Sequence, residues 1–188
     1  MKIVLIFLSF LIISSVYAQE ETPNEIRLEK GVQDIGDYAQ HVPAAAALAL
    51  IIINKDKKGF WQFTKSYGTT LGATMVLKYA INKPRPDGAT DGHAFPSGHT
   101  AVAFSGASFV QRRYGWKFGI PAYLVAGYVG YSRIEGLNDR HDGWDVLAGA
   151  IVGIGSTYIF TTPYQRDHYE LSFKSGGGDY LLGINYKF

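Results

Sequence analysis

Residues 94–104, with the sequence AFPSGHTAVAF, place Ser97, Gly98 and His99 immediately before an apolar run. Pro96 disfavours helix before it and serine is a good N-cap, so the pattern predicts a helix beginning here. Backbone N–H groups at a helix N-terminus attract anions, and glycine allows close approach. His99 can give such an anion a proton. The competing interpretation is an ordinary cap with a solvated histidine.

A second histidine, His141, is followed four residues later by Asp145 at the start of another expected helix. At this spacing the carboxylate can accept a hydrogen bond from one imidazole nitrogen, which leaves the other as a nucleophile or base. Such a pair is also common on protein surfaces. We interpret the histidines without such a partner as structural or solvated: His41, His93 and His168.

Cationic residues accompany both histidines. Lys78 and Arg85 are seven residues apart, a spacing that returns to the same face of a helix, although Pro84 and Pro86 make the second position extended. Arg133 ends the apolar segment that precedes the second histidine. Two cations directed at one place favour an anion site. A lysine and an arginine flanking a helix end at the surface is the alternative.

Three segments, taken in order, resemble the three motifs of the type-2 phosphatidic acid phosphatase superfamily. They are KYAINKPRP at 78–86, PSGH at 96–99 and SRIEGLNDRHDGWD at 132–145. This superfamily includes lipid phosphate phosphatases, bacterial class A acid phosphatases and vanadium haloperoxidases. The resemblance covers about residues 43–162. The short chain most resembles small bacterial lipid phosphatases, including lipid A 1-phosphatases.

The resemblance implies a phosphate cradle without a metal or another cofactor. Lys78, Arg85 and Arg133 would bind the equatorial phosphate oxygens. The backbone N–H groups around Ser97 and Gly98, with the serine hydroxyl, would complete the cradle. Such donors stabilise the charge that develops in the transition state.

The resemblance also assigns the catalytic steps. His141 would attack phosphorus and form a phosphohistidine, with Asp145 orienting it. His99 would protonate the leaving oxygen and then deprotonate the water that cleaves the intermediate. The last motif departs from the family pattern, because seven residues instead of five separate Arg133 from the histidine. Arg140 is therefore the alternative phosphate ligand.

The length and composition indicate one domain that is large enough to bury a hydrophobic core. The chain has 188 residues, a net charge of +2 and 18% charged residues, below the usual share of about 25%. This charge is too small to indicate nucleic-acid binding. Abundant glycine suggests tightly packed helices near a membrane. The absence of cysteine excludes disulfides, thiol catalysis and cysteine metal sites.

The pattern of residues at the N-terminus is typical of a targeting segment. Lys2 precedes an apolar run over residues 3–16, which is shorter than the roughly 20 residues of a spanning helix. We expect cleavage after Ala18, so residues 1–18 are interpreted as a signal peptide, with an uncleaved anchor as the alternative. The protein would be exported to the bacterial periplasm or an envelope membrane.

Hydrophobic spacing predicts an all-α bundle of about five to six helices with the motifs at helix ends. The expected helices cover residues 25–40, 43–53, 60–82, 98–112, 116–134 and 144–161. We divide the chain into an N-terminal segment (19–42), a phosphatase domain (43–165) and a C-terminal hairpin (166–188). The apolar runs are marginal for spanning, which favours a helical domain that touches or partly enters a membrane over a soluble bundle.

The C-terminal segment changes to a period of two. Residues alternate over 169–173 and again over 180–188, with GGGD between them, which predicts a β-hairpin. A terminal Phe188 is similar to the last strand of outer-membrane barrels, and the outer membrane is therefore a possible location. A hairpin packed against the helices or against a partner is the favoured interpretation.

The sequence thus predicts a metal-independent phosphatase acting on a phosphomonoester or pyrophosphate of a lipid. The substrates considered are undecaprenyl pyrophosphate, phosphatidic acid, phosphatidylglycerol phosphate and lipid A. The alternatives are a soluble periplasmic acid phosphatase of broad specificity, a vanadium haloperoxidase and a non-enzymatic outer-membrane protein. The expected partners are a phosphorylated lipid or small phosphoester and a membrane, but no nucleic acid. The oligomeric state stays open.

Overall fold

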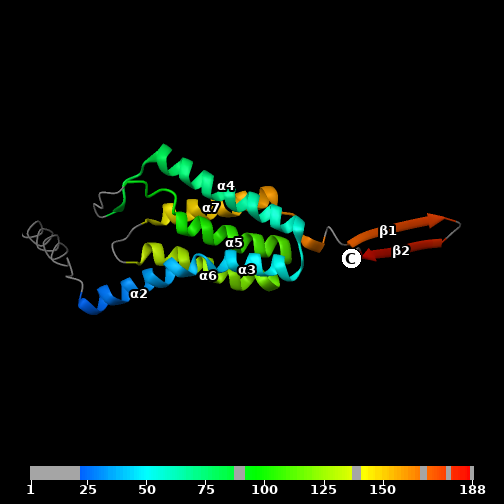
Figure 1. Ribbon diagram of the computed structural model, residues 1–188, viewed down its shortest axis with the longest axis horizontal. Coiled ribbons are helices and arrows are strands. Elements are labelled where there is room, and N and C mark those ends of the chain that lie inside the picture. The colour runs from blue at the N-terminus through cyan, green and yellow to red at the C-terminus, as the bar shows by residue number, and fades with distance from the viewer. Residues whose placement is uncertain (1–21, 87–91, 137–140, 166–168, 177–178, 187–188) are drawn as a thin grey trace, which may run out of the picture.

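The computed structural model describes residues 22–86, 92–136, 141–165, 169–176 and 179–186. Within these ranges the chain forms six helices and one two-stranded sheet (Figure 1). The helices are α2 (Pro23–Ala39), α3 (Val42–Ile53), α4 (Lys57–Ile81), α5 (Gly98–Tyr114), α6 (Trp116–Ile134) and α7 (Gly143–Phe160). The predicted all-α bundle is confirmed, with the bounds of each helix within three residues of expectation. The expected signal peptide, residues 1–18, lies outside the described residues.

Short polar side chains begin the helices that carry the motifs. Ser97 caps α5, where its hydroxyl accepts a hydrogen bond from the N–H of Thr100. Asp142 caps α7 and forms a capping box with Asp145, in which each carboxylate accepts from the other residue's N–H. The residues that precede and open these two helices are therefore fixed by local hydrogen bonds.

Helix α5 is the central element of the bundle. It packs against α3, α4, α6 and α7, and most of its length is buried (Figure 1). The hydrophobic core lies along it and includes Phe109, Val110 and, from α6, Val129. An N-terminus that belongs to such a central helix is held in place from several sides.

Glycines bring α7 very close to α5, as the composition suggested. A Cβ at Gly149 would lie 2.5 Å from the backbone oxygen of Ser97, and one at Gly153 would lie 2.4 Å from that of Ala101. The N–H of Ser97 also donates to the backbone oxygen of Asp145 at 2.9 Å. The second and third sequence motifs are thus joined directly, backbone to backbone.

Helix α2 packs against the C-terminal part of α6. A Cβ at Gly36 would lie 2.0 Å from Ser132 Oγ and 2.5 Å from Arg133 Nη2. The glycine therefore permits an approach that any larger residue would prevent. This contact brings the N-terminal segment to the end of the bundle that carries the motifs.

The expected C-terminal hairpin is confirmed. Strands β1 (Tyr169–Gly176) and β2 (Asp179–Tyr186) pair antiparallel, with Tyr169 opposite Tyr186 and Gly176 opposite Asp179. In Figure 1 the hairpin extends beyond the end of the bundle, away from the helix faces. Among the described residues of the hairpin, packing on the helices, one of the two expected arrangements, is not observed.

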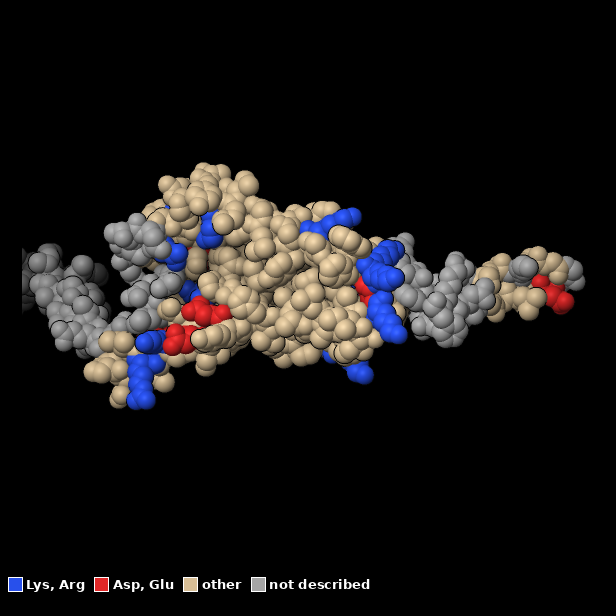
Figure 2. Space-filling model, viewed as in Figure 1, with Lys and Arg blue, Asp and Glu red and all other residues tan. Residues whose placement is uncertain are grey.

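Two stretches in the described residues are long and apolar enough to cross a membrane, residues 23–53 and α7. Large apolar side chains are exposed around the bundle, among them Ile52, Trp61, Val76, Leu124 and Ile159. On the face shown in Figure 2, most charged side chains lie toward the two ends of the bundle. This distribution suits a bundle whose middle meets lipid.

Candidate active site

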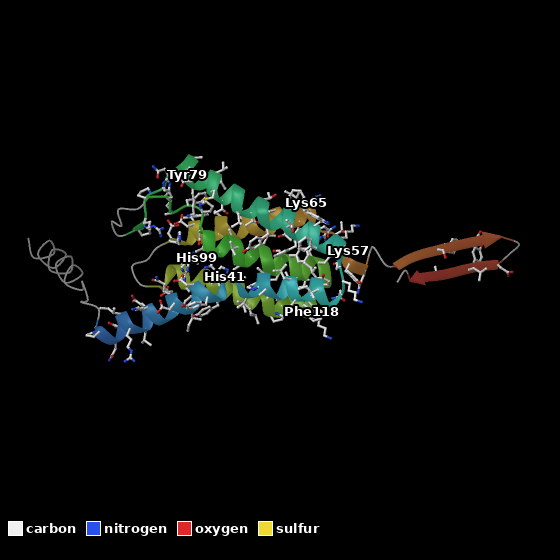
Figure 3. All side chains as sticks on the ribbon, viewed as in Figure 1. His41, Lys57, Lys65, Tyr79, His99 and Phe118 are labelled. Carbon is white, nitrogen blue, oxygen red and sulfur yellow. The ribbon has the colours of Figure 1, made fainter. Side chains whose placement is uncertain are left out.

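One end of the bundle contains a cavity of about 500 Å³ that collects most of the predicted site residues. Those lining it are Lys78, Arg85, Gly98, His99, Arg133 and His141. They come from α4, the segment after it, α5, α6 and the residue that precedes the N-cap of α7. Figure 3 shows His99 at this end, opposite the end that carries Lys57 and Phe118. Residues up to 63 positions apart in the sequence therefore converge on one space.

Two predicted residues, Ser97 and Asp145, do not line the cavity. The hydroxyl of Ser97 is fully buried and accepts from the N–H and the hydroxyl of Thr100, at 3.4 and 3.0 Å. Its side chain is thus engaged in the helix cap, while Gly98 presents backbone to the cavity. Asp145 is also fully buried and lies behind His141.

The pair of His141 and Asp145 has the predicted i,i+4 arrangement. Nδ1 of the imidazole lies 3.4 Å from Asp145 Oδ2 and makes no hydrogen bond to the described residues. Burial lowers the pKa of His141 to about 4, assisted by the nearby cation of Lys78 and opposed by Asp145. The imidazole is therefore neutral near pH 7, with Nε2 as the nitrogen remote from the carboxylate.

Lys83 is a site residue that the sequence reasoning missed. Its Nζ donates to Asp145 Oδ1 at 2.8 Å and to the capping residue Asp142. Burial lowers the pKa of Lys83, but the hydrogen bonds to both carboxylates outweigh this and raise it. Lys83 lies between Lys78 and Arg85, the two cations of the first motif, and this position in the sequence could have marked it as a candidate site residue.

Lys78 is held by the segment that precedes the second motif. Its Nζ donates to the backbone oxygen of His93 at 2.7 Å, and His93 Nδ1 lies 3.0 Å from the backbone oxygen of Lys78. The His93 ring also packs against Tyr79, with centroids 4.7 Å apart. One turn earlier on α4, Thr74 Oγ1 is buried beside the cavity without a hydrogen bond to the described residues.

Arg133 is almost entirely buried, and its guanidinium group forms hydrogen bonds with residues of α2. Its Nη1 donates to Asp37 Oδ1 at 2.6 Å, and its Nη2 donates to the backbone oxygen of Gln33 at 2.9 Å. The same Asp37 oxygen lies 3.2 Å from His99 Nε2. Asp37 is the second residue that the sequence reasoning missed, because no spacing links it to the motifs. The alternative ligand Arg140 lies outside the described residues.

Acidic and histidine side chains do not gather as metal ligands in the part of the chain that the structure describes: no group of three or more is found. Charge at the cavity comes instead from Lys78, Arg85 and Arg133. Independence from metal stays a prediction.

Comparison with known proteins identifies the family. The sequence profile of the PAP2 superfamily matches residues 59–169, which include all three motifs. Lipid A 4'-phosphatase of Helicobacter pylori is 29% identical over 172 residues, which cover 83% of this chain and 85% of that protein. Lipid A 1-phosphatase of Porphyromonas gingivalis is 45% identical over 134 residues, which cover 64% of this chain but 28% of that longer protein.

Solved structures share the fold. The crystal structure of Aquifex aeolicus LpxE superposes with a TM-score of 0.59 at 23% identity, covering 74% of this chain and 87% of that one. The transmembrane PAP2 type phosphatidylglycerolphosphate phosphatase from Bacillus subtilis gives 0.55 at 22% identity, covering 84% and 92%. The profile spans more than half of the chain, and six of the eight predicted site residues that it contains line one cavity. The chain therefore belongs to the PAP2 superfamily and is a phosphatase of that family.

Proposed function

We propose that this protein is a metal-independent lipid phosphatase that removes a phosphate from lipid A, or from a related lipid phosphomonoester, through a phosphohistidine. One observation carries the proposal. Three cations, a helix N-terminus and two histidines meet at one cavity, and its wall continues as the apolar side chains of Leu71, Met75 and Val102. The first group of residues suits a phosphate, and the second suits a lipid.

The chemistry follows from the charges. Lys78, Arg85 and Arg133 bind the phosphate oxygens together with the backbone at Gly98, and they supply the charge stabilisation that a metal ion gives in other phosphatases. Their attraction strengthens as negative charge builds up on the equatorial oxygens. Binding energy is then used in the transition state, where it accelerates the reaction.

Two proton-balanced steps complete the reaction. Nε2 of neutral His141 forms a bond to phosphorus as the bond to the leaving oxygen breaks, and His99 gives its proton to that oxygen. Water then attacks phosphorus, the nitrogen–phosphorus bond breaks, and His99 takes the proton from the water as inorganic phosphate departs. Asp145 stabilises the charge that His141 acquires in the first step.

A membrane setting agrees with this substrate class. Two apolar stretches of spanning length, the exposed apolar side chains and the charged ends of the bundle (Figure 2) support placing the middle of the bundle in lipid. The site then lies near one membrane surface, where a phosphorylated headgroup is presented. We place that surface on the periplasmic side, because export is what we expect from the sequence of residues 1–18. The proposed phosphatase domain, residues 43–165, is joined at its site by α2 of the N-terminal segment, whose Asp37 contacts Arg133 and His99.

The names of the relatives favour lipid A within this class. Both relatives are lipid A phosphatases, one specific for the 1-position and one for the 4'-position. Lipid A carries its phosphates as monoesters on a sugar, which requires a polar cradle with an apolar flank. The cavity described above has both parts.

The test uses purified protein in detergent with lipid A, phosphatidic acid and p-nitrophenyl phosphate as substrates. Wild type should release phosphate from lipid A and should form an acid-labile, alkali-stable phosphoenzyme. His141→Ala should lose at least about 10³-fold in rate and the phosphoenzyme signal. His41→Ala is the matched control, because His41 lies at the same end of the bundle (Figure 3) but does not line the cavity. A folded His141→Ala protein with near-normal turnover would overturn the mechanism.

A further inference from the structure

We propose that Asp37 selects the leaving group, so that the site prefers phosphomonoesters with an uncharged leaving group over diphosphates. The inference rests on the proposed function and narrows its substrate class. Asp37 belongs to α2, outside the three motifs, and its side chain, which is 40% exposed, contacts two residues that line the cavity, Arg133 and His99.

The geometry places one carboxylate oxygen between two residues that the substrate needs. Asp37 Oδ1 lies 2.6 Å from Arg133 Nη1 and 3.2 Å from His99 Nε2. The leaving oxygen must also approach His99 to take its proton. Asp37 therefore occupies, or directly borders, the space into which the leaving group departs.

Packing fixes the part of the α2 backbone that carries Asp37. Gly36 sits against Ser132 and Arg133 so closely that a Cβ would lie 2.0 Å from Ser132 Oγ. The backbone oxygen of Gln33 accepts from Arg133 Nη2 at 2.9 Å. Substrate binding can rotate the Asp37 side chain, but the backbone of α2 cannot retreat without breaking these contacts. The negative charge thus stays near the leaving group.

The effect of the Asp37 carboxylate on the reaction depends on the charge of the leaving group. A sugar or alcohol hydroxyl is neutral, and a carboxylate can accept hydrogen bonds from neighbouring hydroxyl or amide groups of a sugar. A diphosphate instead departs as a phosphate monoester, which brings negative charge next to Asp37. Like charges at such a distance repel, and in a partly exposed site we expect about a tenfold penalty.

The experiment compares farnesyl monophosphate with farnesyl diphosphate. Both carry the same prenyl chain, but loss of the terminal phosphate releases neutral farnesol from one and anionic farnesyl monophosphate from the other. We measure kcat/KM for both substrates on each preparation, because their ratio is independent of the fraction of folded enzyme. Wild type should favour the monophosphate. Asp37→Asn should shift the ratio at least about tenfold toward the diphosphate.

Asp34→Asn is the control, since it removes the same charge from an exposed position one turn earlier on α2 and should leave the ratio unchanged. An active Asp37→Asn enzyme with the wild-type ratio would overturn this proposal alone. So would a folded Asp37→Asn enzyme that is inactive on both substrates, because Asp37 would then belong to the chemistry itself. A wild type inactive on both substrates and on lipid A would overturn the proposed function as well.

Discussion

Lys83 and Asp145 form an ion pair that joins the first sequence motif to the third, with Nζ of the half-buried lysine 2.8 Å from Oδ1 of the fully buried carboxylate. The other oxygen of the same carboxylate lies 3.4 Å from His141 Nδ1 and also accepts from the N–H of Asp142 at 3.2 Å. The carboxylate is therefore held from three directions behind the proposed nucleophile. Lys83 positions His141 indirectly, without lining the cavity.

Replacing Lys83 with methionine should lower kcat about 10- to 100-fold while KM changes little. The substitution leaves a buried carboxylate without its cation, so the carboxylate and the imidazole it orients shift from their places, and small displacements of a reacting group are costly. Steady-state kinetics on a short-chain lipid phosphate measure both parameters. Lys65→Met, at an exposed position on α4, is the control. A raised KM with unchanged kcat would instead make Lys83 a substrate ligand.

Most of the site was predictable because its residues sit at helix ends that the sequence specifies locally. Ser97 and Asp142 cap α5 and α7, and these caps set the positions of His99 and His141. The helix bounds and the hairpin follow from hydrophobic periodicity, whose physical basis is the burial of one face. Local rules therefore place the two histidines at helix starts, whereas the roles of Lys78, Arg85 and Arg133 were expected from the family resemblance.

Asp37 could not be predicted in the same way. Its contact with Arg133 joins residues 96 positions apart and depends on α2 packing against α6 through Gly36. The spacing of residues within the sequence motifs does not predict a tertiary contact of this kind. Lys83 was missed for another reason: it lies beside two cations that were assigned to the anion site, and no spacing links it to its actual partners, the carboxylates of Asp142 and Asp145.

Arg113→Met should lower the free energy of unfolding by about 3–5 kcal/mol, because it leaves the buried carboxylate of Asp56 without its cationic partner. Asp56 Oδ1 accepts a hydrogen bond from Arg113 Nη2, and Asp56 Oδ2 accepts one from Arg113 Nε, each at 2.7 Å. Asp56 also caps α4 by accepting a hydrogen bond from the N–H of Gly59. Burial raises the pKa of Asp56, but these hydrogen bonds outweigh it and the net pKa is lowered. The pair's contribution is thus present above the unfolded pKa of about 3.8 and is lost progressively as the pH falls from that value through the lower folded pKa.

Thermal unfolding in detergent, at pH 7 and at pH 3.5, measures this effect. The wild type should lose stability between the two pH values, and Arg113→Met should be less stable at pH 7. Lys57→Met, an exposed cation at the same end of the bundle (Figure 3), should match wild type. Equal unfolding temperatures for Arg113→Met and wild type at pH 7 would show that the pair contributes nothing net.

Vanadate should inhibit competitively and more strongly than phosphate, while exhaustive EDTA treatment should leave the rate unchanged. Vanadate adopts the trigonal-bipyramidal geometry of phosphoryl transfer and can take an axial bond from Nε2 of His141. The cations Lys78, Arg85 and Arg133 suit its equatorial oxygens. Initial rates with each inhibitor and after chelation provide the measurement. Activity lost in EDTA and restored by a divalent metal, with indifference to vanadate, would replace this mechanism by a metal-dependent one.

The proposed nucleophile should stay unprotonated down to about pH 4. Burial and the cation of Lys78 disfavour the imidazolium of His141 more than Asp145 favours it, which gives the pKa of about 4. Above that pH the imidazole is neutral and can attack phosphorus; below it the lone pair is protonated and the reaction stops. Burial, Lys78 and Arg85 all lower the pKa of His141, and Lys78→Met removes one of these three causes, so the pKa of His141 should rise in this variant although phosphate binding weakens. Histidine ¹³C NMR titration measures the pKa directly, with the His141 signal identified by its absence from His141→Ala. A wild-type midpoint near the ordinary 6.5, or one that does not move upward in Lys78→Met, would contradict this electrostatic account of the nucleophile.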